Sequence, residues 1–211
     1  MRGASPRQLL LQGLFDQLYT RFAWGYDVAA LVAGAGLWYR WVEQALPLVE
    51  RGPVLEIGFG RGHLLPLLRA RGLTAIGLDA SAQMVRHVAP RHRAVVQGVA
   101  QALPFARDTF ATLITTFPAP FVVAEASQRE FARLLRPDGV WFWVDAPRFA
   151  ETQELSSRRI STLPSALLSR ALHAPASDED PRTMMPLVDW QATAHRRQVG
   201  PSTIGVWEMR P

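Results

Sequence analysis

Three glycines and two carboxylates are the residues of this sequence whose types and spacing could do chemistry. Gly58, Gly60 and Gly62 follow directly after an apolar stretch that carries Glu56. Asp79 ends a second apolar stretch, roughly 20 residues beyond the glycines. Glycine permits a tight turn and the close approach of a ligand to the backbone, both of which a Cβ would block. A carboxylate at this distance accepts hydrogen bonds from ribose hydroxyls, so the spacing predicts a binding loop for a nucleoside-type cofactor.

Strands and helices must flank this loop to position it. Val54–Ile57 is a short apolar run, typical of a buried strand, and a helix is expected over 62–71. A second strand over 74–78 leads to a second helix over 82–89, for which Ser81 is a suitable N-cap. Apolar strands that alternate with helices indicate a parallel sheet with both faces covered.

The alternation continues along the chain and predicts a doubly wound α/β fold. A final pair of strands, 189–199 and 203–209, is expected to form an antiparallel hairpin around 200–202. Between the first unit and this hairpin we expect strands over 94–97, 111–116 and 140–144, and a helix over 125–135.

Two segments fall outside the alternating pattern. Residues 1–50 predict an N-terminal helical cap, with helices over 8–22 and 26–48. Residues 51–211 form the sheet domain, in which 146–187 interrupts the rhythm as a helical insertion or lid. The cap is rich in aromatic residues, which favours a hydrophobic ligand beneath it. Packing against the sheet alone is the competing interpretation.

Composition limits the classes of protein that fit. The chain has 211 residues, 48% hydrophobic and 19% charged, which is typical of a globular protein rather than a disordered one. The longest apolar run, 28–39, is too short to cross a bilayer. There is no cysteine, which excludes disulfides and thiolate metal sites and favours a cytoplasmic protein.

All of the basic side chains are arginine, and the net charge is +5. The arginines are scattered and no nucleic-acid-binding motif accompanies them, so no nucleic-acid partner is expected. The charge leaves contact with an anionic membrane surface open. No group of His, Asp and Glu has metal-ligand spacing, so no metal is expected either.

A nicotinamide dehydrogenase would require the pattern G-x-G-x-x-G, with glycine at position 63. That position is His63, and the third glycine is Gly62 instead. The sequence therefore disfavours an NAD-dependent oxidoreductase.

The sequence resembles the class I S-adenosylmethionine-dependent methyltransferases, in the small-molecule and lipid-modifying branch that includes ubiquinone and menaquinone C-methyltransferases. The Tyr26-Asp27 pair resembles the N-terminal Tyr-Asp of this branch. The other matching segments, in the family's order, are Glu56–Gly62, Gly77–Met84, Ala102–Phe105 and Leu134–Gly139. The resemblance implies a Rossmann-like, mostly parallel seven-stranded sheet with an antiparallel C-terminal strand.

The resemblance also implies where the cofactor, S-adenosyl-L-methionine, would bind. Glu56 would orient its ammonium group and Asp79 would accept both ribose hydroxyls. The family usually has an acid where this chain has Val99, so backbone groups or Gln101 would have to recognise the adenine. The remaining implied cofactor contacts are Gly58, Phe59, Gly60 and Gly62 along the methionine moiety, Ala80 and Met84 near the ribose and adenine, and Ala100 along the adenine edge.

Methyl transfer by in-line displacement requires positioning of the two reactants and a base only if the nucleophile arrives protonated. Candidate catalytic residues are Asp145, at the end of a strand, His63, beside the glycine loop, and Tyr26. The competing interpretations are a turn or cap role for Asp145, a helix-end role for His63 and a core position for Tyr26.

The sequence thus predicts methyl transfer to a small, hydrophobic or lipid-like acceptor. The segment Phe117-Pro118-Ala119-Pro120 lacks the Asn or Asp and the adjacent prolines of nucleobase amino-methylases, which argues against a nucleic-acid base as acceptor. The alternative is a non-catalytic module of the same fold that binds a membrane surface or a protein partner.

Overall fold

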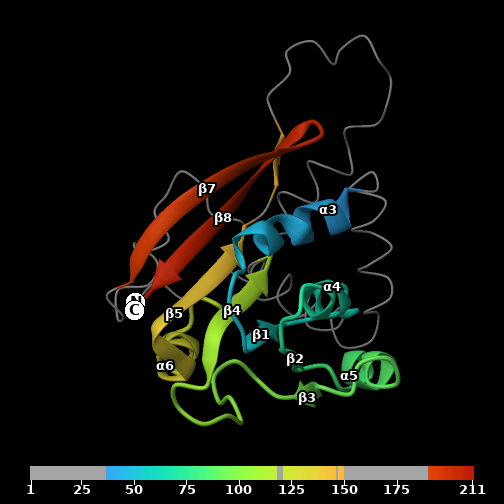
Figure 1. The fold of residues 1–211 in the computed structure, drawn as a ribbon, viewed down its shortest axis with the longest axis vertical. Helices are drawn as coiled ribbons and strands as arrows, with labels where there is room; N and C mark the ends of the chain where they lie inside the picture. The colour runs from blue at the N-terminus through green and yellow to red at the C-terminus, as the bar shows by residue number, and fades with distance from the viewer. Residues whose placement is uncertain (1–36, 118–120, 146, 150–189) are drawn as a thin grey trace, which may run out of the picture.

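The computed structural model describes residues 37–117, 121–145, 147–149 and 190–211. Its centre is a single twisted sheet in the strand order β3-β2-β1-β4-β5-β8-β6, with β7 paired to the free edge of β8 (Figure 1). The strands are β1 (Val54–Ile57), β2 (Ala75–Asp79), β3 (Val95–Gln97), β4 (Phe110–Thr116), β5 (Leu135–Val144), β6 (Arg148–Phe149), β7 (Gln191–Val199) and β8 (Ser202–Arg210).

The first five strands are parallel, whereas β8 runs antiparallel to β5 and β7 antiparallel to β8. The predicted Rossmann-like, mostly parallel sheet with an antiparallel C-terminal strand is therefore confirmed. All seven predicted strands are present, and the two-residue β6 extends the sheet beyond them.

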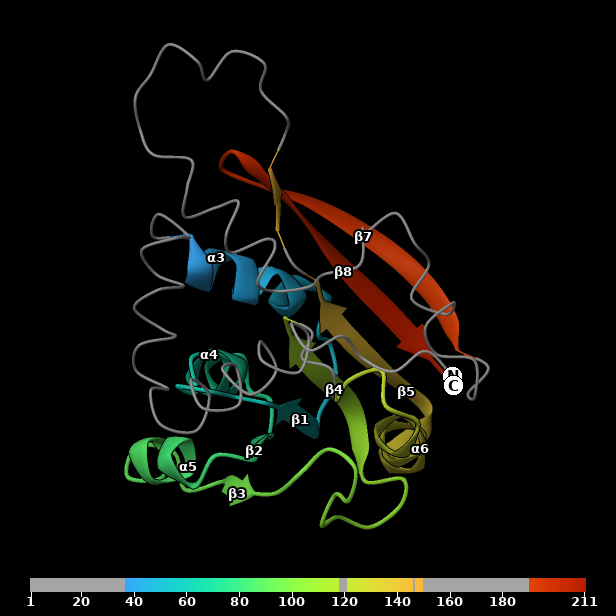
Figure 2. The same cartoon turned by 180° about the vertical axis from the view of Figure 1, so that it is seen from behind.

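Helices cover both faces of the sheet (Figures 1 and 2). The short helix α3 (Trp38–Val42), the 3₁₀ helix η1 (Glu43–Leu48), α4 (Leu64–Ala70) and α5 (Ala82–Val88) lie on one face, and α6 (Glu125–Leu134) lies on the other. None of the described helices is long and apolar enough to span a bilayer.

Alternation along the strands builds a separate core on each face. Val54 packs in the core beneath α3 and α4, whereas Leu55 packs in the core beneath α6. In β5 the alternation is Val140, Phe142 and Val144 against Trp141 and Trp143. Because successive side chains of a strand point to opposite faces, Glu56 shares the α4 face with Val54.

Three local features differ from the sequence predictions. The sequence predicts an α-helix over 26–48. In the described part of that range, only Trp38–Val42 is α-helical, and the chain continues as the 3₁₀ helix η1. Pro47 lies inside η1, and a proline there cannot donate the α-helical hydrogen bond and would clash with the carbonyl four residues earlier. The helical insertion predicted over 146–187 is also wrong near its start, because Arg148–Phe149 pairs with β8 as a strand.

The third difference concerns 136–139, which the sequence predicts to be a turn between α6 and a strand. The structure includes these residues in β5, but as an irregularity: Leu135 pairs with Phe110 and Val140 pairs with Thr112, so the segment between bulges from the ladder. The helix predicted over 8–22 and most of the insertion over 146–187 lie outside the described residues.

Candidate functional site

The glycine loop lies where the strand order reverses. The chain passes from β1 to β2 on one side of it and later returns to β4 on the other side. In open parallel sheets, ligands bind at the carboxyl ends of the strands at this point. Gly58, Gly60 and Gly62 have φ values of +77°, +53° and +72°, a region that favours glycine.

The surroundings of the three glycines differ. A Cβ on Gly62 would lie 2.8 Å from Cγ1 of Val88, so this glycine allows α5 to pack against the loop. A Cβ on Gly58 would lie 3.8 Å from the ring of Phe121, whereas a Cβ on Gly60 would meet no atom of the described residues within 4 Å. Within the described part of the chain, the loop is therefore open at Gly60, where a ligand can approach the backbone.

Phe59 turns away from this opening. Its side chain is 4% exposed, and its ring packs against Gly77. A Cβ added to Gly77 would lie 2.7 Å from that ring. Only the backbone of Phe59 is then available to a ligand. The need for glycine at 77 follows from this ring, and sequence reasoning did not find it.

Asp79 joins the end of β2 to the loop. Its Oδ2 accepts a hydrogen bond of 2.9 Å from the amide of Gly60, and its Oδ1 accepts one of 2.8 Å from the amide of Ser81. Burial raises the pKa of Asp79, and the two amide hydrogen bonds oppose that shift. A carboxylate oxygen has more than one acceptor site, so both oxygens retain capacity for ribose hydroxyls.

Glu56 is the most unusual group of the site. Its side chain is 2% exposed, and its Oε2 has no hydrogen-bond partner among the described residues. Burial, reinforced by the charge of Asp79, raises its pKa to about 8. A buried acceptor without a donor is costly, and a donor that carries positive charge would satisfy it. The two carboxylates and the open glycine loop thus fit a ligand that has both an ammonium group and a ribose.

The segment expected to contact adenine is accessible. Val99 is 48% exposed, whereas Ala100 is buried at 6%. Ala80 and Gln101 are exposed and Met84 is partly buried. The amide of Ala102 donates to the carbonyl of Val99 over 3.1 Å, which forms a tight turn. Adenine recognition by these residues stays a prediction.

The three candidate catalytic residues have different environments. His63 Nε2 lies 2.6 Å from Oε1 of Glu43, and its ring lies 4.3 Å from that of Tyr39, so it links the loop to α3 and η1. Asp145 is 3% exposed at the end of β5, where its amide donates to the carbonyl of Gly205 over 2.9 Å. Tyr26 lies outside the described residues. A chemical role for each of them stays a prediction.

Aromatic side chains border the same edge of the sheet. Phe117, directly after β4, has a φ of +54°, and its ring lies 4.4 Å from that of Trp38 in α3. Phe121 lies against the glycine loop at Gly58. A bulky residue at positive φ is a genuine outlier, and such strain concentrates at functional sites. The sequence places Phe117 directly after a predicted strand. Nothing in the sequence indicates its positive φ or its contact with Trp38.

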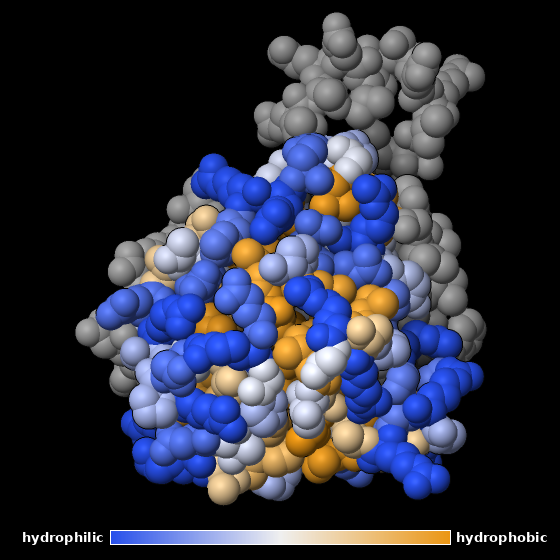
Figure 3. Space-filling view, in the orientation of Figure 1, coloured by the Kyte–Doolittle hydropathy of each residue, from blue (hydrophilic) through white to orange (hydrophobic). Residues whose placement is uncertain are grey.

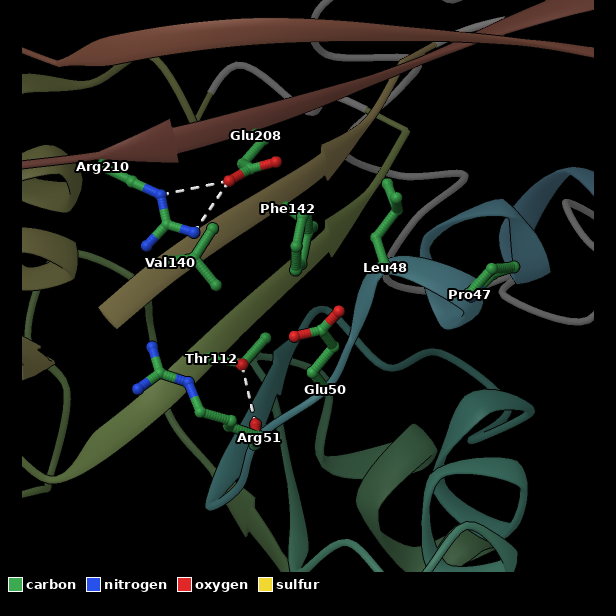
Figure 4. Close-up of a pocket in the computed structure, with 9 residues that line it drawn as sticks. All are labelled: Pro47, Leu48, Glu50, Arg51, Thr112, Val140, Phe142, Glu208 and Arg210. Carbon is green, nitrogen blue, oxygen red and sulfur yellow. Dashed lines mark hydrogen bonds and ion pairs between the residues drawn. The ribbon is translucent and has the colours of Figure 1, made fainter. Parts of the chain in front are cut away.

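A separate cavity of about 340 Å³ lies at the opposite edge of the sheet, between η1 and the strands β4, β5 and β8 (Figure 4). Thr112, at the start of β4, donates to the carbonyl of Arg51 over 2.8 Å, and Arg210 donates to Glu208 over 2.8 Å (Figure 4). Arg51 also pairs with Asp138. Glu208 and Arg210 of this wall pair with each other, and the partner of Arg51 lies outside it, which is typical of a structural cluster.

Comparison with known proteins identifies a matching domain. Residues 54–139 match the model of a family described as a methyltransferase domain. An uncharacterized methyltransferase of Bacillus subtilis (strain 168), YcgJ, is 33% identical over 100 residues, which make up 44% of this chain and 40% of that protein.

Solved structures extend the likeness beyond this domain. A protein of Thermotoga maritima, described as an S-adenosylmethionine-dependent methyltransferase and possible histamine N-methyltransferase, superposes with a TM-score of 0.62 at 17% identity over 92% of this chain and 99% of that one. A geranyl diphosphate C-methyltransferase of Streptomyces coelicolor A3(2), solved with S-adenosyl-L-homocysteine, has a TM-score of 0.56 at 12% identity over 80% of this chain and 77% of that one. At these identities the likeness shows the fold.

Proposed function

We propose that the protein transfers a methyl group from S-adenosylmethionine to a small acceptor, in keeping with the match of residues 54–139 to a methyltransferase domain. The observation that carries the proposal is the pair of buried carboxylates, Glu56 and Asp79, on either side of a glycine loop that is open at Gly60. S-Adenosylmethionine has the ammonium, ribose and compact backbone-facing chain that these groups fit.

Each group of the site has a distinct task in this proposal. Glu56 holds the ammonium of the cofactor, and Asp79 accepts the two ribose hydroxyls while its bond to the Gly60 amide fixes the loop. When bound, the cofactor supplies a methyl group on a positively charged sulfur. The protein then has to orient the acceptor and exclude water, and orientation of this kind contributes roughly 7–11 kcal/mol to catalysis.

The acceptor we propose is hydrophobic or lipid-like. The rings of Trp38, Phe117 and Phe121 surround the carboxyl ends of β1 and β4, where the acceptor must meet the methyl group. Asp145, at the end of the neighbouring β5, is the group we assign to contact a polar or protonated part of the acceptor. The Streptomyces relative is named for an isoprenoid diphosphate, which supports an acceptor of this kind, whereas the Thermotoga relative is described as a possible histamine methyltransferase.

We propose that this reaction takes place in the cytoplasm, in keeping with the absence of cysteine from the chain. The surface in Figure 3 is largely hydrophilic, with apolar residues near its middle.

A matched pair of glycine substitutions tests the cofactor site. Gly60 and Gly72 both have positive φ (+53° and +79°), and a Cβ on either meets no described atom within 4 Å. Gly60→Val and Gly72→Val should therefore each destabilise the fold by about 1–2 kcal/mol. Only Gly60→Val should also weaken the binding of S-adenosyl-L-homocysteine, by about 100-fold or more, because its side chain enters the open loop.

Isothermal titration calorimetry with S-adenosyl-L-homocysteine measures both variants beside the wild type. Equal affinity in Gly60→Val and the wild type contradicts this site. Absence of binding to the wild type refutes the proposed function and favours the non-catalytic module. Transfer of radiolabelled methyl groups to a panel of isoprenoid, fatty-acid and quinone-like acceptors then tests the acceptor class.

A further inference from the structure

Glu56 is buried in the middle of the sheet, one residue before β1 ends. It is 2% exposed and pairs in register with Gly77 on β2 and Ile114 on β4. Its Oε2 has no hydrogen-bond partner among the described residues. An ionised carboxylate whose Oε2 is buried without a donor from the described residues is poorly stabilised.

Among the described residues, the groups that shift the pKa of Glu56 do not include a cation. From β2, the nearest acid is Asp79, whose negative charge disfavours ionisation of Glu56. β4 is Phe110–Thr116 and contributes no titratable group. In the glycine loop Arg61 is exposed, and His63 is engaged with Glu43 of η1. Asp145 ends β5, which is separated from β1 by β4.

We propose that the cofactor site takes up its cationic ligand in exchange for the proton on Glu56, so that occupancy of the site depends on pH. This inference rests on the proposed function, since the ligand is S-adenosylmethionine or its product. The exchange is balanced: the ammonium of the ligand replaces the proton as the positive partner of the carboxylate, and the proton passes to the solvent.

The direction of the pH dependence follows from the free state. Burial and Asp79 raise the pKa of Glu56 to about 8 without ligand. About nine-tenths of the molecules then carry this proton at pH 7, whereas an adjacent ammonium favours the ionised form. Affinity for the ligand should therefore rise about tenfold per pH unit between pH 6 and 7 and level off near pH 8.

Two ligands separate Glu56 from Asp79 as the source of the proton. S-Adenosyl-L-homocysteine has the adenine, the ribose and the ammonium. 5′-Methylthioadenosine has the adenine and the ribose but lacks the amino-acid part. A proton lost from Asp79 on ribose binding would appear with both ligands, whereas a proton lost from Glu56 appears only with the first.

Calorimetric titration of the wild-type protein at pH 6.5, in phosphate and in imidazole, measures the protons released, because the two buffers differ in their heat of ionisation. We expect close to one proton released with S-adenosyl-L-homocysteine and close to none with 5′-methylthioadenosine. The affinity of the first ligand should rise about tenfold from pH 6 to 7, while that of the second stays constant. Glu56→Gln, which has nearly the same shape but cannot titrate, should bind the first ligand with no released proton.

The outcomes separate a failure of this inference from a failure of the proposed function. If S-adenosyl-L-homocysteine does not bind, the proposed function fails. If it binds without proton release, or if 5′-methylthioadenosine releases the same proton, the exchange at Glu56 is overturned while the methyltransferase assignment stands. The two-ligand comparison uses the wild type alone, so it decides the question even if Glu56→Gln does not fold.

Discussion

The pKa values of buried and paired carboxylates are shifted in opposite directions at the two ends of the strands. At the amino edge, where the parallel strands begin, the hydrogen bond from Arg51 lowers the pKa of Asp138. Burial acts to raise the pKa of Glu208, but hydrogen bonds from His195 and Arg210 outweigh it and lower that pKa. At the carboxyl edge, Glu56 and Asp79 are buried beside each other and both pKa values are raised.

This difference separates structure from function. At the amino edge, Asp138 and Glu208 are each paired with an arginine and so already have a positive partner. At the carboxyl edge, Glu56 and Asp79 form no ion pair with a basic side chain of the described residues. Such an arrangement costs stability and is retained where a ligand supplies the missing charge.

The largest expected effect is on the stability of the ligand-free protein. The pKa of Glu56 is raised from its ordinary 4.5 to about 8, so the folded state holds this proton more tightly than the unfolded state. The resulting stabilisation is complete below about pH 4.5 and is lost as pH rises towards 8. The span corresponds to at most about 5 kcal/mol.

Urea denaturation of wild type and Glu56→Gln at pH 5, 6, 7 and 8 measures this loss. Other groups, such as His92, whose pKa is lowered, titrate in both proteins. Their contributions cancel when the free energies of unfolding of the two proteins are subtracted. The variant should gain stability relative to the wild type as pH rises. A difference that is flat with pH would mean that the carboxyl edge is not under electrostatic strain.

The next effect contrasts the edges directly by ligand affinity. Asp79→Asn keeps the shape but places an NH₂ group where a carboxylate oxygen accepts from Gly60 or Ser81. Charged hydrogen bonds contribute about 1.5–3 kcal/mol each, so the affinity for S-adenosyl-L-homocysteine should fall about 100-fold. Asp138→Asn makes the same chemical change at the exposed amino edge and should leave that affinity within about twofold. Equal losses in the two variants would remove the distinction between the edges.

Much of the fold was predictable because the strands are buried on both faces. Runs such as Val54–Ile57 and Phe110–Thr116 are buried along nearly their whole length, and the sequence places them within a residue or so of their observed ends. The 3₁₀ geometry of η1 and the short β6 were not predicted. They depend on a proline inside a helical pattern and on a pairing with β8 that is distant in sequence.

The site divides in the same way. Positive φ at Gly58, Gly60 and Gly62 follows from the glycine spacing, which the sequence shows. The hydrogen bond from the Gly60 amide to Asp79 was not predicted. The partners of His63 and Phe117 come from α3 and η1, about 20 residues or more away, and no pattern specifies such contacts. The pKa of Glu56 likewise depends on burial by several elements and on Asp79, and could not be deduced from the motif.

The smallest effect concerns backbone strain, which also differs between the edges. Two described non-glycine residues have positive φ: Asp108, in the turn before β4, and Phe117, directly after it. Aspartate tolerates this conformation through local hydrogen bonding, whereas a bulky aromatic residue does not. The strain at Phe117 is therefore specific to the carboxyl edge.

Comparison of Phe117→Gly with Phe117→Ala isolates this strain. Both variants lose the ring and its contact with Trp38, but only glycine adopts a φ of +54° without cost. The glycine variant should be more stable than the alanine variant by about 1–2 kcal/mol, the reverse of their usual order. At Asp108, the glycine variant should likewise be more stable than the alanine variant. The wild-type protein with Asp108 should be about as stable as this glycine variant. Denaturation midpoints of the four variants decide the matter: if alanine equals glycine at Phe117, the loop after β4 relaxes when the ring is removed, and the ring itself holds the backbone in its left-handed conformation.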